Sequence, residues 1–544
     1  MRFFFMIHQL KFDKHKKVQY EIHTTKNIEM KQIKFLSLFF FLALLLMTPQ
    51  SCTNLDETIY SDLDGDKFFS NPENIASAFG VAYTNLYWTM GHKYGVGRDC
   101  GTDILCVPQR GGDWLDGGEW HRYHRLTMTP KEAYVEFWWN LLYSGVNTCN
   151  RLILGFDQLG LESAKPAIAE LRAFRAFYYW YLMDIYGNVP LVTSFDVPAD
   201  FAPSNNSRIE IYNFIEQEVN AVLPELSKET GRSIYSRMNY YAAQMLLAKL
   251  YINAEIYTGT AQWAKAETAL DAIINSGEFA LEADYFANFS NNADASKESI
   301  FAVPMDEVLA QGLEVHLFSL HYSLQQKFQL TQLPWNGLSA QEKFFNLFAS
   351  TDKRRNGLLF GPQYDANGVQ ITDPSFEKFN PANPALPRDP DGAGLNLTPA
   401  LNMLEPNCLR QAGARIIKYF PTPGTGRYMS NDVQIFRYAD ALLMKAEVMV
   451  RQGNAAGAAE FFNMVRARAG IAAIAAPTLN DLLDERAREL YAEGHRRNDL
   501  IRFGKFLEER WGKPSASPET AILWPIPQTQ IDNNPNLQQN PGYN

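Results

Sequence analysis

The segment from Asp103 to His124 concentrates residue types that bind polar ring compounds. It contains two similar runs, Arg110-Gly-Gly-Asp113-Trp114 and Asp116-Gly-Gly-Glu119-Trp120. The flat face of a tryptophan stacks on the apolar C–H face of a sugar ring, and carboxylates, amides and guanidinium groups bind the sugar hydroxyls. Glycine pairs interrupt regular structure and let loops project their side chains. We predict ligand-binding roles for Trp114, Trp120, Asp113, Asp103 and Arg110. The alternative is that both tryptophans fix the loop onto the scaffold.

Three further aromatic residues lie on or beside predicted loops. Trp335 lies within Leu333-Pro-Trp-Asn-Gly337, Trp88 ends a predicted helix, and Tyr428 precedes the last helical hairpin. We predict that these three residues also belong to the ligand site. The aromatic run 177–181 is different, because consecutive residues of a helix point in all directions and such a helix is buried on several sides. That run, together with Trp138 and Trp139, is expected to form core.

Other residue constellations favour structural roles over catalysis. His121 and His124 are three residues apart and could share a helix face as metal ligands, but no third ligand follows at a recognised spacing. The carboxylates Glu489 and Glu493 have opposite charges three or four residues away, which favours ion pairing over a glycosidase carboxylate pair. The chain contains neither a nucleophile elbow nor a phosphate-binding loop. We therefore predict no catalytic residues, no metal and no cofactor.

The N-terminal region predicts an exported, acylated protein. A hydrophobic run from Phe35 to Met47 follows Lys31 and Lys34 and ends shortly before Cys52. The run is shorter than the roughly 20 apolar residues of a bilayer-spanning helix, so we interpret it as a cleaved signal. Cys52 is then the lipidated first residue of the mature protein. The alternative is an ordinary secretory signal with an incidental cysteine.

Composition indicates a globular protein without nucleic-acid binding. The 544 residues are 46% hydrophobic and 20% charged, and the aromatic share of 13% is high. The net charge is −10 and the mature region contains no basic block, which argues against binding to phosphates. Cys100, Cys106, Cys149 and Cys408 match no metal-binding spacing. We expect either buried thiols or a disulfide such as Cys100 with Cys106.

Two helical regions flank a loop-rich one. Apolar periodicity predicts helices over residues 74–88, 131–156, 164–186, 209–226, 237–258 and 261–276, and again from 432 to about 510. Prolines are dense in the intervening region, especially from Pro374 to Pro406, and they exclude long helices and central strands there.

The helices are predicted to form hairpins. In the last helical region, Ala446, Ala458 and Phe462 keep the intervals of a tetratricopeptide repeat (TPR), and Gly453-Asn454 separates the two helices. Small alanines let paired helices approach closely, and the phenylalanine fills the groove between them. Residues 237–276 repeat this pattern with a longer turn.

Several long motifs resemble the SusD/RagB family. They are LRAFRAFYYWYLMDIYGNVPL (171–191), FRYADALLMKAE (436–447), ERARELYAEGHRRNDLIR (485–502), LWPIPQ (523–528) and NPNLQQNPGY (534–543). The resemblance implies a mainly α fold, a SusD-like α-α superhelix in which TPR-like helical hairpins form a scaffold for a loop-rich ligand-binding face. It also implies a lipoprotein on the outer membrane of Bacteroidota that passes a glycan, or sometimes a peptide, to a SusC-type TonB-dependent transporter. The pair Asp56-Glu57 resembles the export tag of such lipoproteins.

Together these observations divide the chain into four segments. Residues 1–51 are an upstream segment and signal peptide, with Met30 as the expected start, and residues 52–280 are a helical region with TPR-like pairs. Residues 281–430 form the loop-rich ligand face, and residues 431–544 are the C-terminal helical region and tail. We predict a cell-surface lipoprotein that binds a nutrient, an oligosaccharide or polysaccharide, and delivers it to the transporter. The alternatives are a surface lipid-anchored polysaccharide-degrading enzyme and a TPR-type structural adaptor.

Overall fold

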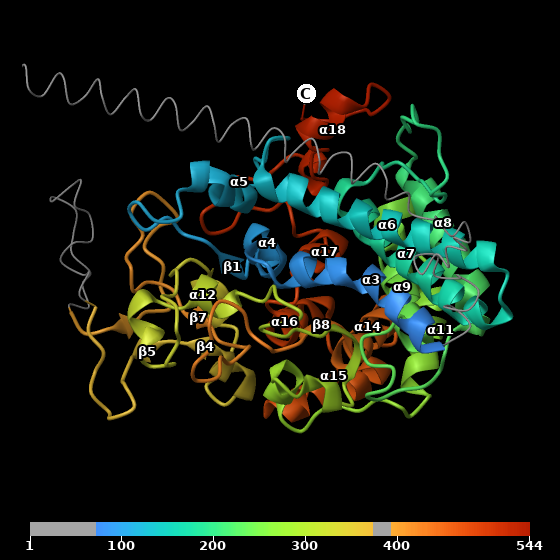
Figure 1. Ribbon diagram of the computed structural model, residues 1–544. Coiled ribbons are helices and arrows are strands. Elements are labelled where there is room, and N and C mark those ends of the chain that lie inside the picture. Colours follow the sequence, from blue (N-terminus) through green and yellow to red (C-terminus); the bar gives the residue numbers. More distant parts are fainter. Residues whose placement is uncertain (1–71, 374–392, 544) are drawn as a thin grey trace, which may run out of the picture. The chain divides into compact units, whose positions relative to one another are not determined.

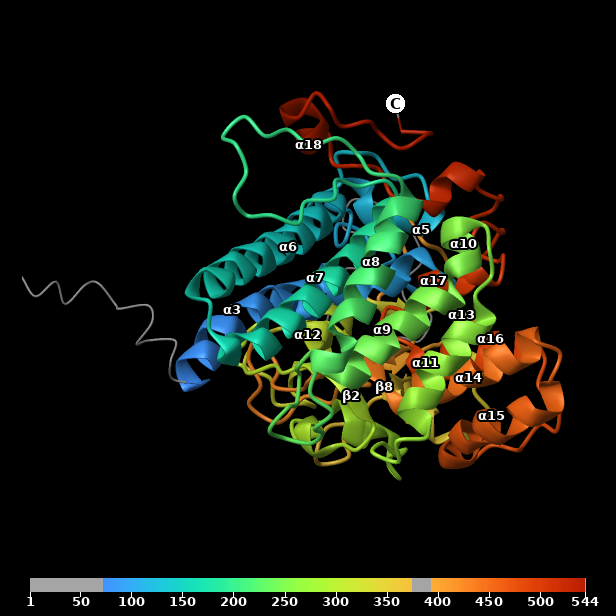
Figure 2. The ribbon, with the colours of Figure 1, turned by 90° about the vertical axis from the view of Figure 1, so that its right-hand side faces the viewer.

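Long helices dominate the first half of the structure. The computed structural model describes residues 72–373 and 393–543 (Figure 1). Cys52, the signal segment and the Asp56-Glu57 pair lie outside the described residues. The helices α3 (Pro72–Gly91), α6 (Ala133–Leu159), α7 (Lys165–Tyr186) and α8 (Arg208–Val222) pack in series, each against the next. Figure 2 shows α6, α7 and α8 lying side by side.

The aromatic run in α7 belongs to the core, as predicted. Phe177, Tyr178 and Tyr179 are fully buried, and Trp180 and Tyr181 nearly so. Trp138 and Trp139 of α6 are buried against the same layer. Because α7 packs against both α6 and α8, its apolar residues are covered on opposite sides.

Two helical hairpins match the TPR-like pattern. The helix α9 (Tyr240–Ile252) pairs with α11 (Trp263–Ile274), with the short α10 (Ala254–Thr258) between them, and α14 (Tyr438–Arg451) pairs with α15 (Ala455–Ala469). Ala446, Ala458 and Phe462 are fully buried in the second pair. Gly453 has φ 88°, a left-handed conformation that favours glycine, and it ends the first helix of that pair. The TPR-like scaffold is therefore confirmed.

One predicted helical segment is a strand. Residues from 432 onward were expected to be helical, but β8 (Val433–Arg437) pairs antiparallel with β2 (Ser299–Val303) before α14 begins. Val433 and Ile435 are β-branched and buried, and the ladder supplies the hydrogen-bond partners that a buried backbone needs. The sequence did not predict this strand, because the helical periodicity of the adjoining α14 was extended over its five residues.

The middle of the chain is rich in loops, as predicted. In its described residues, 281–373 and 393–430, the α-helices are the short α12 (Val315–Ser319) and α13 (Glu342–Phe345). Its remaining strands have two residues each: β3 (Ser339–Ala340), β4 (Leu358–Leu359), β5 (Gly361–Pro362), β6 (Asn396–Leu397) and β7 (Arg415–Ile416). β3 pairs antiparallel with β1 (Leu105–Cys106), with Leu105 opposite Ala340. That pairing brings the loop after β1 close to the loop that precedes β3.

The C-terminal helices carry a buried network of ion pairs. They are α16 (Leu479–Leu490) and α17 (Arg496–Arg502), followed by a tail with α18 (Gln528–Asn533). Arg437 pairs with Glu298, Glu489 and Glu493, all of them buried. The structural role predicted for Glu489 and Glu493 is confirmed.

The cysteines and the described helices give two further findings. Cys100, Cys106, Cys149 and Cys408 are all buried as thiols, so the expected alternative of a disulfide between Cys100 and Cys106 is not realised. Within residues 72–373 and 393–543, every helix is too short or too polar to cross a bilayer.

Candidate functional site

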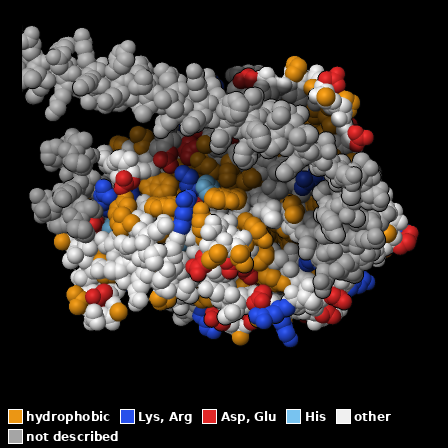
Figure 3. Space-filling model, in the orientation of Figure 1, with side chains coloured by type: hydrophobic (Ala, Val, Ile, Leu, Met, Phe, Trp, Pro, Cys, Tyr) orange, Lys and Arg blue, Asp and Glu red, His pale blue; other side chains and the backbone are white. Residues whose placement is uncertain are grey.

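A cleft of about 750 Å³ lies where three loops meet the end of α3. Its lining combines tryptophans with charged and polar side chains: His92, Lys93, Gly112, Asp113, Trp114, Asp116, Glu314, Tyr322, Leu333, Pro334, Trp335 and Arg427. Figure 3 shows hydrophobic side chains gathered beside charged side chains over the region of α4 (Lys93–Val96) and α5 (Glu119–Arg125). Two of the predicted ligand tryptophans, Trp114 and Trp335, thus share one cavity.

Trp114 is held in place from several sides. Its indole Nε1 donates a hydrogen bond of 2.7 Å to the backbone carbonyl of Trp335. Its ring packs on Phe318 with 5.1 Å between the ring centroids, and a Cβ added to Gly337 would come within 2.4 Å of the ring. Lys93 lies above the ring, with Nζ 5.8 Å from its centroid. Trp114 has φ 62°, which is an uncommon backbone conformation for a bulky residue. The contacts described above stabilise this conformation.

Asp113 presents a carboxylate whose geometry is fixed by two neighbours. Its Oδ2 accepts hydrogen bonds from the hydroxyl of Tyr322 and, at 3.2 Å, from Arg410. Burial and the contact with Asp113 raise the pKa of Tyr322 to about 12, so the hydroxyl stays protonated and donates. The other lone pairs of the half-exposed Asp113 carboxylate can accept hydrogen bonds from a ligand hydroxyl.

A second polar group lies at the far end of the cleft. Burial, helped by the nearby cations Lys93 and Arg427, lowers the pKa of His92 to about 4, so its ring is neutral at pH 7. Burial raises the pKa of Glu314, which accepts a 2.7 Å hydrogen bond from Arg427 Nε. Nδ1 of the neutral imidazole accepts a hydrogen bond from the backbone N–H of Tyr94 at 3.4 Å, which leaves Nε2–H to donate to a ligand hydroxyl.

Two other predicted residues lie at the rim beside His92. The Trp88 ring centroid lies 5.5 Å from that of His92 and 6.2 Å from that of Tyr428. Trp88 remains 40% exposed. The Arg427 guanidinium lies 5.3 Å from the Tyr428 ring centroid. These rings extend the aromatic surface of the cleft outward.

Three predicted ligand residues lie elsewhere. Trp120 is only 2% exposed and packs behind Trp114, with Phe318 and Tyr94 around it. Arg110 is fully buried and donates to the backbone carbonyls of Asn336 and Ala412. These two residues support the loops instead of lining the cleft.

Asp103 faces a different part of the protein. It forms two hydrogen bonds, of 2.7 and 2.8 Å, to the guanidinium of Arg496 in α17. Burial alone would raise its pKa, but Arg496 outweighs burial and lowers it. Asp103 lines a separate cavity beside α17.

Six polar or charged residues of the cleft are not among the ligand residues predicted from the sequence: His92, Lys93, Asp116, Tyr322, Glu314 and Arg427. The pair His92-Lys93 follows the predicted end of the first helix. Its position just after a helix end could have indicated that these side chains lie on the loop side of the structure. Tyr322, Glu314 and Arg427 come from the proline-rich middle region or its edge, where no periodicity indicates which side chains face inward.

The histidines near the loop do not share a metal site. The two ring nitrogens of His124 lie 3.0 and 2.8 Å from the carbonyl oxygens of Cys100 and Trp511. His121 Nδ1 lies 2.6 Å from the carboxylate of Glu405. Among the described side chains, we find no group of three histidine, cysteine or acidic residues placed to hold a metal ion.

Comparisons with known proteins agree on one family. A family described as "SusD family" matches residues 410–518, and one described as "Starch-binding associating with outer membrane" matches residues 106–252. The starch-binding protein SusD of Bacteroides thetaiotaomicron is 30% identical over 413 residues, which cover 69% of this chain and 72% of that protein. SusD-like protein P38 of Formosa agariphila is 22% identical and covers 94% of this chain and 100% of its own length.

Solved structures share the fold. The surface glycan-binding protein A of Bacteroides thetaiotaomicron, in complex with laminarihexaose, aligns with a TM-score of 0.69 at 22% identity, over 86% of this chain and 99% of that one. A laminarin-binding SusD-like protein aligns with a TM-score of 0.67 at 21% identity, over 87% and 100%. These likenesses confirm the mainly α fold.

Proposed function

This chain belongs to the SusD family, and from that premise we propose that it captures a neutral glycan at the cell surface. The glycan would bind in the cleft between Trp114 and Trp335, with its ring faces on the indoles. Relatives named for binding starch and laminarin favour a glucan as the ligand. The protein binds the glycan without cleaving it in this proposal.

The pairing of charges in the cleft is the observation that carries the proposal. Each carboxylate of the lining has a cationic partner: Lys93 lies 3.8 Å from Asp116, Arg427 2.7 Å from Glu314 and Arg410 3.2 Å from Asp113. No cation of the described lining is left over for an anionic sugar. Fixed aromatic faces with mutually neutralised polar groups suit a ligand made of neutral rings and hydroxyls.

We further propose delivery to a SusC-type TonB-dependent transporter in the outer membrane. The mature protein would be anchored there through a lipid on Cys52, which the sequence motif supports. The description "Starch-binding associating with outer membrane" of one matching family supports the outer-membrane location, and the transporter is the partner that the resemblance to the SusD family implies.

Affinity gel electrophoresis with laminarin and starch tests the binding proposal. We expect at least one polysaccharide to retard the wild-type protein, and Trp335→Ala to abolish most of the retardation. Trp263→Ala is the matched control, because Trp263 is a half-buried tryptophan on α11 outside the cleft. Equal retardation of the wild type and Trp335→Ala would refute this site.

The same samples separate the alternatives. Released oligosaccharide after incubation would favour a polysaccharide-degrading enzyme, and the absence of retardation by any neutral polysaccharide would favour an adaptor. Palmitate labelling of the wild type but not of Cys52→Ala would establish the anchor. Co-purification of a large outer-membrane barrel would establish the partner.

A further inference from the structure

A second cavity, of about 360 Å³, lies on the outward face of α6. The helix supplies one wall through residues spaced by three or four, such as Asn140, Tyr143 and Asn147. The loop that follows α7 supplies a second wall, and the C-terminal tail around α18 supplies a third. Figure 2 shows that loop and α18 next to each other above α6.

The lining of this cavity contains no ionisable acid or base except the hydroxyl of Tyr143. Five of its side chains are amides, and three are aromatic: Asn140, Asn147, Asn150, Gln530 and Asn534, with Trp139, Tyr143 and Phe201. We call this set the amide pocket. Amides offer both donors and acceptors without charge, which suits sugar hydroxyls, and apolar rings suit the C–H faces of a sugar.

The walls of the amide pocket are fixed by hydrogen bonds to the backbone of the loop. Tyr143 donates to the carbonyl of Pro190 at 2.9 Å, and the buried Asn150 donates to that of Val192 at 2.9 Å. Asn534 of the tail donates to the carbonyl of Pro203 at 2.8 Å. The cavity is therefore formed before any ligand arrives, which lowers the entropy cost of binding.

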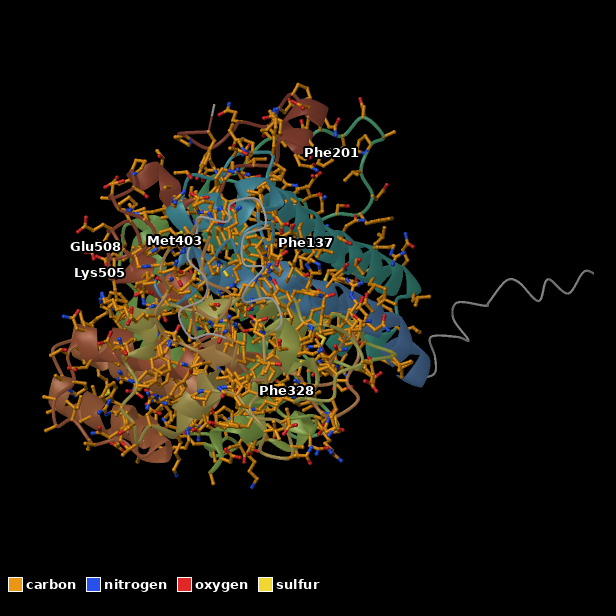
Figure 4. The ribbon with its side chains drawn as sticks, turned by 90° about the vertical axis from the view of Figure 1, so that its left-hand side faces the viewer. Phe137, Phe201, Phe328, Met403, Lys505 and Glu508 are labelled. Carbon is orange, nitrogen blue, oxygen red and sulfur yellow. The ribbon has the colours of Figure 1, made fainter. Side chains whose placement is uncertain are left out.

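Other amides of the pocket keep unused hydrogen-bonding capacity. Asn147 is exposed, and its side chain has no hydrogen-bond partner among the described residues. Asn140 only accepts one long contact, 3.4 Å, from Gln530. Phe201 is 45% exposed at the edge of the pocket, and Figure 4 shows it on the loop close to α18. An uncharged pocket with free amides and an exposed ring is chemically suited to a neutral sugar.

We propose that the amide pocket is a second binding site for a neutral sugar unit, separate from the cleft. The two sites use different faces of α6. On the cleft side, the Phe137 ring packs 5.1 Å from that of His92, whereas Trp139 and Tyr143 line the amide pocket. A single glycan long enough to reach both sites would bind the second site with a raised effective concentration once it is held at the first.

Ligand-observed NMR with laminarihexaose and maltohexaose tests this proposal in the Trp335→Ala protein, whose cleft is disabled. We expect saturation transfer to at least one hexaose to persist. Adding Asn147→Asp, which places a carboxylate in the uncharged pocket, should weaken that residual binding about tenfold. Phe201→Ala should also weaken it, and because Asn147 and Phe201 are exposed, neither change should unfold the protein.

Ser144→Asp is the matched control. Ser144 is exposed on α6 one turn before Asn147 and does not line the pocket. Adding Ser144→Asp to Trp335→Ala should therefore leave the residual hexaose binding unchanged. Loss of all hexaose binding in Trp335→Ala overturns the second site, whatever the wild-type cleft binds. Equal binding by the wild type and Trp335→Ala, with loss only in Asn147→Asp, instead refutes the proposed cleft and supports the second site. A third outcome also overturns the proposal. If adding Asn147→Asp to Trp335→Ala leaves hexaose binding unchanged but abolishes co-purification of a barrel, the pocket is a contact with that protein.

Discussion

Trp114 and Trp335, which lie on loops 221 residues apart, are joined by a hydrogen bond of 2.7 Å from the indole nitrogen of one to the backbone carbonyl of the other. The bond fixes one aromatic wall of the cleft to the backbone of the other. Because of this bond, neither tryptophan can move independently of the other loop. A substitution that displaces Trp114 should therefore alter glycan binding even when the substituted residue does not contact the ligand.

Gly337→Ala should weaken glycan binding through Trp114. The new methyl group would lie 2.4 Å from the indole, so the ring must shift away from its hydrogen bond with Trp335. We expect a loss of about tenfold in affinity, equivalent to about 1.4 kcal/mol, measured by calorimetry with the best-binding glycan. Gly112→Ala is the control in the same cleft, because no atom lies within 4 Å of a Cβ at Gly112. Equal affinities for the two variants would show that the position of Trp114 does not matter.

Substituting alanine for two glycines of α6 should change the free energy of unfolding in opposite directions. A Cβ on Gly145 would come within 2.3 Å of the ring of Tyr178 in α7, whereas a Cβ on the exposed Gly155 would meet nothing within 4 Å. Gly145→Ala should lower the free energy of unfolding by about 1–3 kcal/mol through overpacking. Gly155→Ala should raise it by up to about 1 kcal/mol through helix propensity. Denaturant unfolding measures both, and destabilisation by Gly155→Ala would contradict the packing described for α6.

Removing Arg437 should strongly destabilise the protein. Burial alone would raise the pKa of Glu489, but Arg468, Arg437 and Arg354 outweigh burial and lower it, so the carboxylate is charged. Arg437→Met leaves buried carboxylates partly unpaired and should cost about 3–5 kcal/mol of unfolding free energy. Arg232→Met is the control, because its pair with Asp294 is exposed and should change stability by at most about 1 kcal/mol. Similar midpoints for the two variants would refute the structural role of the network.

His495 should make the protein less stable as the pH falls. Burial and the adjacent Lys249 lower its pKa from 6.5 to about 3, and its Nδ1 accepts a hydrogen bond from Lys249 at 3.4 Å. Between these two pKa values the unfolded chain binds a proton that the folded chain does not, so stability falls with falling pH by at most about 1.4 kcal/mol per pH unit.

His495→Gln tests this pH dependence, because a glutamine can accept the same hydrogen bond without titrating. We expect a shallower fall of the unfolding free energy between pH 6.5 and about 4 than in the wild type. Burial raises the pKa of Asp99 and of Asp432 to about 6, and both contribute in the opposite direction. These groups are present in both proteins, so they cancel in the difference. Identical slopes would mean that His495 is protonated in the folded state.

Some parts of this structure follow from local sequence alone. The long helices of the first half were predicted because apolar residues recur at helical intervals, and the break at Gly453 followed from a residue that accepts a positive φ. The aromatic run 177–181 was assigned to the core because its five consecutive rings point to all sides of the helix. A helix with apolar rings on all sides is buried on several of them. The strand β8 was missed because its five residues are too few to show a period of their own beside α14.

The sequence by itself determined which residue types can meet a sugar, and it identified Trp114, Asp113, Trp335, Trp88 and Tyr428 as candidates. Only the tertiary structure decided that Trp120 and Arg110 turn inward while His92, Tyr322 and Arg427 turn toward the cleft. The physical reason is that the cleft is assembled by pairings between distant loops, such as β1 with β3. A glycine-rich loop shows no periodicity, so the direction of its side chains is set by the surfaces against which it packs.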